Sequence, residues 1–205
     1  MIRNIFRLID KVYRKFYRWY CLIHNKCMLY INCVNYGDNL SIRGPIFIRG
    51  GNISIGNNVI INSNMESNPI GGDTQTIMNT YSTGKILIGN NVGMSNCTLC
   101  AYDQIIIEDD VMIGGNVKLY STDFHSLRYD SRIKKIDTDI KSKEILIKKG
   151  AFIGGSSIIL KGVVIGERAV IGAGSVVTHD IPNDEIWAGN PAVFIRKIKN
   201  GSMDK

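Results

Sequence analysis

The side chain in this sequence best suited to acid–base chemistry is histidine, and the chain contains three, His24, His125 and His179. A neutral imidazole can accept the proton of a hydroxyl group while that oxygen attacks an electrophile, because its ordinary pKa of about 6.5 lies close to neutral pH. His125 stands in the polar segment from Ser121 to Ser126, where Asp123 either orients the ring or is an ordinary loop carboxylate. A single loop histidine is more often a plain surface residue, so its role depends on the scaffold that presents it.

Cysteine chemistry has little support in the sequence. The five cysteines form no close pair and no CxxC motif, and their odd number argues against a disulfide framework, so we expect reduced thiols in a cytoplasmic protein. No stretch of about 18 apolar residues is present, so we expect no segment to span a bilayer. Basic residues at Arg7, Lys11 and Arg14 interrupt the first apolar run, which argues against a secretory signal.

The scaffold is encoded most clearly between Ile147 and Val177. Counting in sixes from Ile147 gives a branched aliphatic residue at every step: Ile153, Ile159, Ile165, Ile171 and Val177. Two positions before each of these stands a small or β-branched residue: Ala151, Ser157, Val163, Ala169 and Ser175. An α-helix has a period of 3.6 and a half-buried strand a period of two, so neither produces this pattern. A short extended segment, repeated many times, does.

Stacked repeats of this length predict a parallel β-solenoid, in which each repeat contributes one large aliphatic side chain to a shared core. Three segments per coil make a triangular prism, with corners at glycines such as Gly166 and Gly172. The alternative is a parallel sheet with helical crossovers, which needs about a dozen residues between strands. Residues 147–177 have no room for such a helix.

The repeat extends towards the N-terminus and is interrupted twice. We predict a solenoid over residues 27–181, with polar excursions at 62–84 and 120–146 that leave the prism. Long excursions on a rigid scaffold often carry function, and the second contains His125. Residues 182–205 form a tail, in which Val193 to Lys199 is expected to be a short basic helix.

The periodic run resembles the signature of the hexapeptide-repeat acyltransferases, the left-handed β-helix family. The resemblance covers roughly residues 42 to 195 and is carried by Ile153-Gly154, Ser157, Ile159, Val163, Ile165-Gly166, Ala169, Ile171-Gly172, Ser175, Val177 and Ile181. It implies an all-β protein, a left-handed parallel β-helix with an N-terminal amphipathic helix and a short C-terminal helix. The handedness follows from the resemblance alone, since parallel crossovers are normally right-handed.

The resemblance also implies a site. His125, on a loop that leaves a coil, becomes the catalytic base, and a backbone amide near Gly155 or Ser156 would hold an oxyanion. The donor is acetyl-CoA, which lies between two prisms of a homotrimer, and no metal is expected. The positions that match CoA contacts are Gly155, Ala173, Thr178, His179 and Arg196. For Gly155 and Ala173, corner geometry alone is an equally good explanation. On the acceptor side, the candidates are Asp123 and Asn96, although Met94 is the strictly aligned position.

The segment around His125, the basic loop after it and the WAGNPA sequence from Trp187 resemble members that acetylate sugars of capsules, lipopolysaccharide or other surface glycans. We therefore expect an acetyl-CoA-dependent O-acetyltransferase with a sugar or glycan acceptor. Two alternatives stay open: an acetyltransferase of a small acceptor such as serine or a xenobiotic, and a non-catalytic structural solenoid. Serine-type members carry a large helical N-terminal domain, which about 40 residues before the first repeat cannot supply. The zinc carbonic anhydrases of this fold need three histidines, and only His125 lies within the repeats.

The first 26 residues carry a charge of +6, because seven basic residues face Asp10 alone, while the whole chain carries +7. The basic residues recur at helical spacing and apolar ones occupy the other side, which predicts a basic amphipathic helix. Either this helix lies on an anionic membrane surface, or its apolar side packs on the solenoid end or on another subunit. Nucleic-acid binding is not expected, because the basic residues stop at the helix and no recognised module accompanies them.

Overall fold

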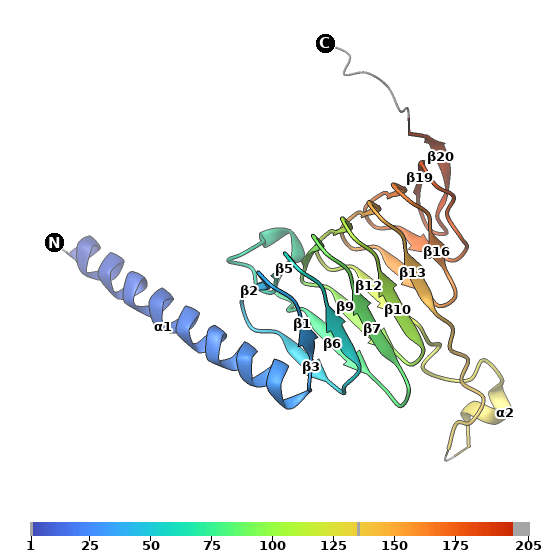
Figure 1. Ribbon diagram of the computed structural model, residues 1–205, viewed down its shortest axis with the longest axis horizontal. Helices are drawn as coiled ribbons and strands as arrows, with labels where there is room; N and C mark the ends of the chain where they lie inside the picture. The colour runs from blue at the N-terminus through green and yellow to red at the C-terminus, as the bar shows by residue number, and fades with distance from the viewer. Residues whose placement is uncertain (1, 135, 199–205) are drawn as a thin grey trace, which may run out of the picture.

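The computed structural model describes residues 2–134 and 136–198, and most of them wind into a prism whose three sides are β-sheets (Figure 1). Sheet A consists of β1 (Asn35–Tyr36), β4 (Ile53–Ile55), β7 (Lys85–Ile88), β10 (Gln104–Ile107), β13 (Ile145–Ile147) and β16 (Val164–Ile165). Sheet B consists of β2 (Ser41–Arg43), β5 (Ile60–Asn62), β8 (Gly93–Ser95), β11 (Met112–Ile113), β14 (Phe152–Ile153), β17 (Val170–Ile171), β19 (Glu185–Ala188) and β20 (Val193–Lys197). Sheet C consists of β3 (Phe47–Arg49), β6 (Ile77–Thr80), β9 (Thr98–Ala101), β12 (Lys118–Tyr120), β15 (Ile158–Leu160) and β18 (Val176–Val177).

The chain passes from sheet A to sheet B to sheet C in each coil, so the prism has three edges, named here the A–B, B–C and C–A corners. Within each sheet, a strand pairs in parallel with the strands of the coils before and after it. A short helix, α2 (Tyr129–Arg132), and a single 3-10 turn (Pro69–Gly71) lie in loops outside the prism. The coil geometry therefore decides which side chains share an edge.

The core is a set of stacked aliphatic side chains, and the six-residue period predicted for Ile147 to Val177 is confirmed. The six large aliphatics at that spacing are all fully buried, as are the small residues two positions before them. Ser157 and Ser175 are buried too, and both hydroxyls donate to the carbonyl of Gly172, at 3.1 and 2.6 Å. These bonds remove the cost of burying a hydroxyl without a partner.

The A–B corner is built from a row of asparagines with left-handed backbone. Asn39, Asn58 and Asn91 have φ between 56° and 59°, and Asp110 continues the row at 61°. Each amide donates to the next residue of the row: Asn39 to Asn58 (2.9 Å), Asn58 to Asn91 (3.1 Å) and Asn91 to Asp110 (2.9 Å). The hydrogen bond from Asn91 and the nearby charge of Lys149 hold the pKa of the Asp110 carboxyl below its usual value. The row thus ends on an acceptor that stays ionised.

The first excursion is shorter than the predicted 62–84, and this boundary is wrong. β6 (Ile77–Thr80) lies inside that range and pairs with β3 and β9, so only residues 63–76 leave the prism. Met78 is its fully buried large side chain, and the polar residues after it donate hydrogen bonds of their own. Asn79 donates to the Tyr81 hydroxyl (2.5 Å) and Thr80 to the Gly51 carbonyl (2.6 Å). Because polar residues stand beside Met78, the six-residue repeat is not recognisable in this part of the sequence. The second excursion, predicted at 120–146, spans residues 121–144 between β12 and β13.

The short helix expected for Val193 to Lys199 is also wrong within the described residues, because Val193–Lys197 form strand β20. β20 pairs antiparallel with β19, which itself pairs with β17 on the last coil. β20 pairs with the edge of β19 that faces away from β17. The indole of Trp187 packs edge-on against the Phe194 ring, with a 6.1 Å centroid separation. β-branched and aromatic residues at these positions favour a strand. Residues 199–205 lie outside the described chain.

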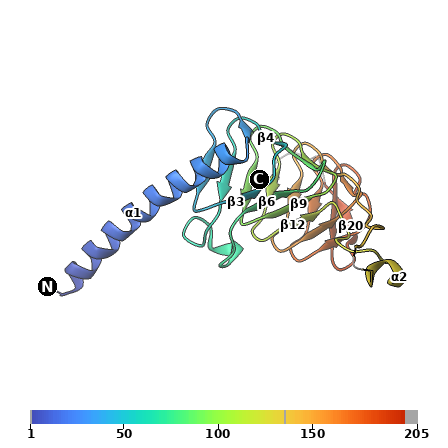
Figure 2. The same ribbon diagram turned by 90° about the horizontal axis from the view of Figure 1, so that it is seen from below.

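The N-terminal helix α1 (Ile2–Ile31) extends five residues beyond the expected 1–26, because its last turns pack on the first coil. Cys21, Asn25 and Leu29, one turn apart, are its only buried residues. The Asn25 amide donates to the Gly44 carbonyl (2.9 Å) and accepts from the Ile46 N–H (3.0 Å). The N-terminal part of the helix projects away from the prism (Figures 1 and 2). Neither helix in residues 2–134 and 136–198 has the length and apolarity needed to cross a bilayer.

The corner row makes Asn91 a test of the backbone geometry. Asn91→Ala loses both amide hydrogen bonds and places a Cβ-bearing residue without a polar side chain at φ 57°, whereas Asn91→Gly loses only the bonds. We expect Asn91→Ala to lower the free energy of unfolding by about 1 kcal/mol more than Asn91→Gly, measured by urea denaturation. Equal losses in the two variants would mean that the amide bonds, and not the left-handed backbone, dominate at this corner.

Candidate active site

His125 lies at the base of the 121–144 loop, which leaves the prism at the C–A corner. Ser121 anchors the loop, because its buried hydroxyl accepts from the N–H groups of Tyr102 (3.0 Å) and Asp103 (3.1 Å). Phe124 packs edge-on against the rings of Tyr102 and Tyr120, with centroid separations of 6.3 and 5.2 Å. Burial raises the pKa of both tyrosines. The residues before His125 are therefore held firmly to the coil.

The His125 imidazole is open to solvent and backed by a carboxylate. Its side chain is 73% exposed, and its Nδ1 lies 3.7 Å from Oδ2 of Asp137, whose side chain is 12% exposed. The same Oδ2 accepts from the N–H of Ser126 (2.7 Å), which fixes the carboxylate beside the ring. With Nδ1 turned towards Asp137, the other ring nitrogen, Nε2, is free to meet a substrate.

Asp123, which the sequence left open as either an orienting group or an ordinary loop carboxylate, has a partner other than the imidazole. Asp123 Oδ1 lies 2.8 Å from the ammonium of Lys161 on the next coil, so Asp123 ties the loop to the prism. Asp137 takes the position beside the ring, and sequence reasoning missed it. Eleven residues of aperiodic loop separate it from His125, so no spacing signal could have found it.

The glycine and alanine predicted to contact CoA lie at the B–C corner, where successive coils come very close. A Cβ on Gly155 would lie 3.1 Å from the Gly115 carbonyl oxygen, and a Cβ on Gly115 would lie 2.7 Å from the Gly71 nitrogen. Ala173 is exposed one coil further on. The Ser156 N–H donates to the Gly115 carbonyl (2.8 Å), whereas the Gly155 N–H has no acceptor within the described part of the chain. Of the two amides suggested for the oxyanion, Gly155 is the one that remains available.

Asn96 also lies at this corner, but its side chain is committed to the structure. It is 1% exposed, has φ 51°, and donates through Nδ2 to the Thr74 carbonyl of the 63–76 loop. Met94, the strictly aligned position, is a core residue of β8 with 2% exposure. A polar group that sequence reasoning missed lies next to them, where Asn62 and Asn68 both donate to the Ser95 hydroxyl, at 3.2 and 2.8 Å.

The predicted site residues thus fall at two edges of one prism. His125, Asp123, Thr178 and His179 lie at the C–A corner, while Asn96, Gly155 and Ala173 lie at the B–C corner. The hydroxyl of Thr178 lies 2.8 Å from Nδ1 of its neighbour His179, and both are exposed. Arg196 is exposed on β20. Within one chain, His125 shares a corner with Thr178 and His179 but lies at a different corner from Gly155 and Ala173.

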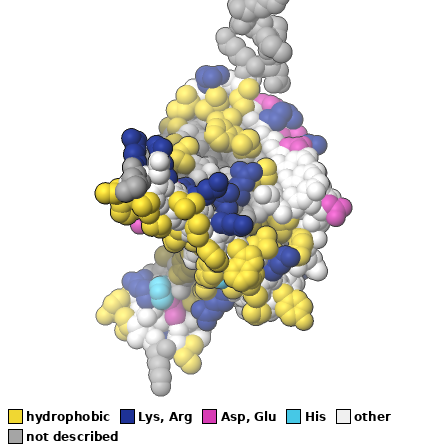
Figure 3. Space-filling model, turned by 90° about the vertical axis from the view of Figure 1, so that its left-hand side faces the viewer, with side chains coloured by type: hydrophobic (Ala, Val, Ile, Leu, Met, Phe, Trp, Pro, Cys, Tyr) yellow, Lys and Arg dark blue, Asp and Glu magenta, His cyan; other side chains and the backbone are white. Residues whose placement is uncertain are grey.

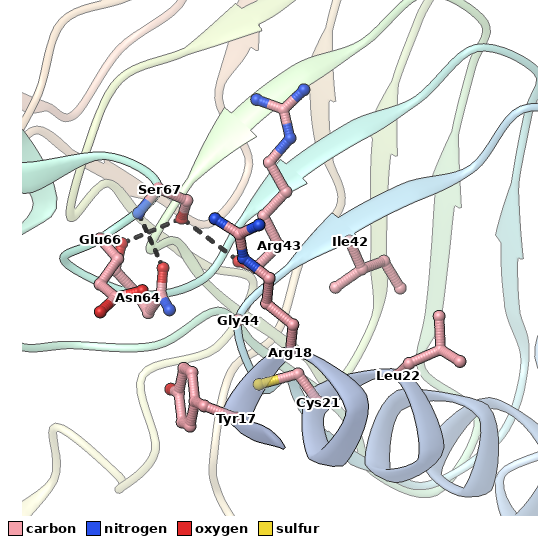
Figure 4. A pocket seen from close by; sticks show the side chains of 10 residues that line it. All are labelled: Tyr17, Arg18, Cys21, Leu22, Ile42, Arg43, Gly44, Asn64, Glu66 and Ser67. Atoms are coloured by element: carbon pink, nitrogen blue, oxygen red, sulfur yellow. Dashed lines mark hydrogen bonds between the residues drawn. The ribbon is translucent and has the colours of Figure 1, made fainter. Parts of the chain in front are cut away.

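A separate cleft of about 540 Å³ lies between α1 and the first two coils (Figure 4). Tyr17, Arg18, Cys21 and Leu22 line it from the helix, and Ile42, Arg43, Gly44, Asn64, Glu66 and Ser67 line it from the prism. The guanidinium groups of Arg18 and Arg43 both extend into it, and Glu66 pairs with Arg14 at 3.5 Å. The cleft lies at the N-terminal end of the B–C corner, away from His125, so it is not the candidate catalytic site. Across residues 2–134 and 136–198, no group of three metal-ligating side chains comes together.

Known proteins with the same repeats match this chain. The family model "Bacterial transferase hexapeptide (six repeats)" matches residues 144–179, and "Hexapeptide repeat of succinyl-transferase" matches residues 104–119. A putative acetyltransferase of Schizosaccharomyces pombe is 44% identical over 105 residues, which cover 51% of this chain and 49% of the relative. A galactoside O-acetyltransferase of Lactococcus lactis is 36% identical over 108 residues, with 53% and 50% covered. The chain spans about half the length of these curated relatives.

Among solved structures, a mutant of AntD, an N-acyltransferase from Bacillus cereus in complex with dTDP and coenzyme A, superposes with a TM-score of 0.66 at 27% identity. The superposition covers 85% of this chain and 89% of that one. The resemblance to the hexapeptide-repeat acyltransferases is confirmed, and with it the left-handed parallel β-helix.

The ion pair beneath the loop gives a direct test of what holds His125 in place. Lys161→Met removes the partner of the Asp123 carboxylate, which is only 19% exposed, so we expect the loop to lose about 1–2 kcal/mol of local stability. Hydrogen exchange of amides in residues 121–144 should accelerate while the strands stay protected. Lys149→Met, at a pair in which the lysine side chain is 63% exposed, is the matched control and should change little. Unchanged exchange in Lys161→Met would contradict an anchoring role.

Proposed function

We propose that this hexapeptide-repeat β-helix is an acetyl-CoA-dependent O-acetyltransferase that acts on a hydroxyl group of a sugar or surface glycan, with His125 as general base. The observation that carries the proposal is the exposed imidazole, which Asp137 backs and a rigid coil presents. The similarity to galactoside O-acetyltransferase supports the acceptor class, and the coenzyme A in the AntD structure supports the donor.

In the proposed reaction, Nε2 of His125 accepts the proton of the acceptor hydroxyl as its oxygen attacks the thioester carbonyl. The C–O bond forms, the carbonyl oxygen becomes an oxyanion, and a preorganised backbone amide such as the Gly155 N–H stabilises it. Collapse of the intermediate breaks the C–S bond, and the imidazolium returns its proton to the departing CoA thiolate. Asp137 is the positioning residue, since it holds the ring with Nδ1 inwards and stabilises the imidazolium.

The separation of His125 from Gly155 supports a site formed between subunits. In a homotrimer, the C–A corner of one prism would face the B–C corner of the next, and the operation would repeat until it closes. Sheet B also carries exposed apolar residues at one register position. Met112 and Phe152 pair on adjacent strands, and they are 61% and 46% exposed. Such residues are suited to contact between copies. In this arrangement Ala173, Thr178 and His179 would flank the donor, and Arg196 could meet a phosphate.

A second acceptor class has its own support. The AntD structure is that of an N-acyltransferase, and the superposition covers most of both chains. An imidazole base serves an amine as well as a hydroxyl, because the ammonium formed on attack must also lose a proton. Amino sugars therefore belong in the acceptor panel beside neutral sugars, glycan fragments, serine and xenobiotic amines.

The first test is CoA release from acetyl-CoA against that panel. Replacement of His125 by alanine should lower kcat by roughly 10²- to 10⁴-fold, because it removes the base, while CoA binding and oligomeric mass are retained. His179→Ala is the comparison, because it removes an imidazole from the same corner and should affect the KM for acetyl-CoA more than kcat. Full turnover in His125→Ala would overturn the mechanism. No release with any acceptor, together with no CoA binding, would favour a structural solenoid.

The two carboxylates of the loop should behave differently. Asp137→Asn should lower kcat roughly 10-fold with little change in the KM for acetyl-CoA, because it loosens the ring without touching the donor. Asp123→Asn should leave kcat closer to wild type, since Lys161 and not His125 is its partner. Steady-state kinetics on both variants checks this. A larger kcat loss in Asp123→Asn would show that Asp123 contacts the reacting groups directly.

A further inference from the structure

Helix α1 has two parts with different surroundings. Its C-terminal third covers the first coil through Cys21, Asn25 and Leu29. In the stretch from Ile2 to Tyr20, no side chain is buried, and the ribbon leaves the prism as a projecting rod (Figures 1 and 2). Capping the solenoid therefore needs only the end of this helix, and the projecting part requires another explanation.

The two sides of the helix differ in chemistry along its whole length. With 3.6 residues per turn, Cys21, Asn25 and Leu29 fall on one side, and Arg18, Arg14 and other basic residues continue that side towards the N-terminus. The opposite side, named here the outer face, points away from the prism and is apolar. Its residues are between 41% and 86% exposed: Ile2, Ile5, Phe6, Ile9, Val12, Tyr13, Phe16, Trp19, Tyr20, Ile23, Tyr30 and Ile31.

The width of the apolar face and the charge of the helix decide between two partners, a second copy of this chain and an anionic bilayer. The apolar residues cover about half of the circumference, whereas a coiled-coil seam with a second copy needs only a narrow stripe. Two copies joined through this face would also bring together helices with the same +6 charge over residues 1–26. An anionic bilayer attracts that charge, and its interface accommodates tryptophan and tyrosine side chains such as Trp19 and Tyr20.

We propose that the outer face of α1 binds the surface of an anionic lipid bilayer, with the helix lying in the plane of the interface. The apolar side chains enter the boundary between headgroups and acyl chains, and the charge of the Lys and Arg side chains on the opposite side attracts the helix to the anionic lipid surface. Figure 3 looks onto this end of the molecule and shows Lys and Arg side chains gathered beside hydrophobic ones. The prism and the Arg18–Arg43 cleft lie on the other side of the helix and stay in water.

Vesicle flotation of the full chain tests the proposal without any reference to catalysis. Wild type should float with vesicles of phosphatidylcholine mixed with phosphatidylglycerol, should bind phosphatidylcholine alone much less, and should lose affinity between about 0.1 M and 1 M salt. Phe16→Ser/Trp19→Ser removes two large side chains of the outer face at nearly constant helix propensity. Arg7→Gln/Lys11→Gln removes charge. Each double variant should bind roughly 10-fold more weakly or worse.

Lys85→Gln is the matched control, because it removes an exposed positive charge from β7, a strand outside the helix contact, and should bind like wild type. Circular dichroism and thermal unfolding establish that each variant remains folded, and if the serine variant is not, the glutamine variant decides. The proposal would be overturned if wild type did not float with anionic vesicles, or if the two double variants bound them as well as wild type does. A fall in oligomeric mass in Phe16→Ser/Trp19→Ser, measured by light scattering, would also overturn it in favour of contact between copies.

Discussion

The hydrogen bonds between one coil and the next are the interaction on which everything else in this molecule depends. Each strand is two to five residues long, which is too short to be stable alone. The strands are stable because they pair with strands on neighbouring coils. Parallel pairing at one register places equivalent residues directly above one another. The aliphatic stack, the asparagine row and the close glycine contacts at the B–C corner all follow from that register.

This constraint explains which parts of the structure could be predicted. Wherever the inward residue is a large aliphatic, as at Ile153 or Ile165, the period is visible in the sequence. β6 was not recognised because Met78 stands beside the polar residues Asn79 and Thr80, which bond to Tyr81 and to Gly51 of the preceding coil. β20 was not predicted as a strand because its partner, β19, is itself positioned by pairing with the last coil. Long-range pairing of this kind leaves no local signal.

The candidate site divides in the same way. His125 could be found because it follows directly on the end of a regular coil, and the family signature surrounds it. Asp137 could not, because its position beside the ring depends on how an aperiodic loop folds back. Asn96 was predicted as a binding residue, but its side chain is buried and donates to the Thr74 carbonyl of the 63–76 loop, a contact that depends on how this loop folds. Loops that leave the coils carry no repeat, so the positions of their side chains could not be predicted from spacing.

The capping of the two ends has a consequence for the size of the molecule. A stack of coils grows by adding identical layers, so a bare end presents three strand edges that could recruit another chain and lengthen into a fibre. At the N-terminal end, the side chains of His24, Asn25 and Asn32 bond to the carbonyls of Ile46, Gly44 and Ile48. At the other end, β20 turns antiparallel to β19 and interrupts the repeating layers. The number of layers is thereby fixed, and an architecture that could extend without limit becomes a particle of defined length.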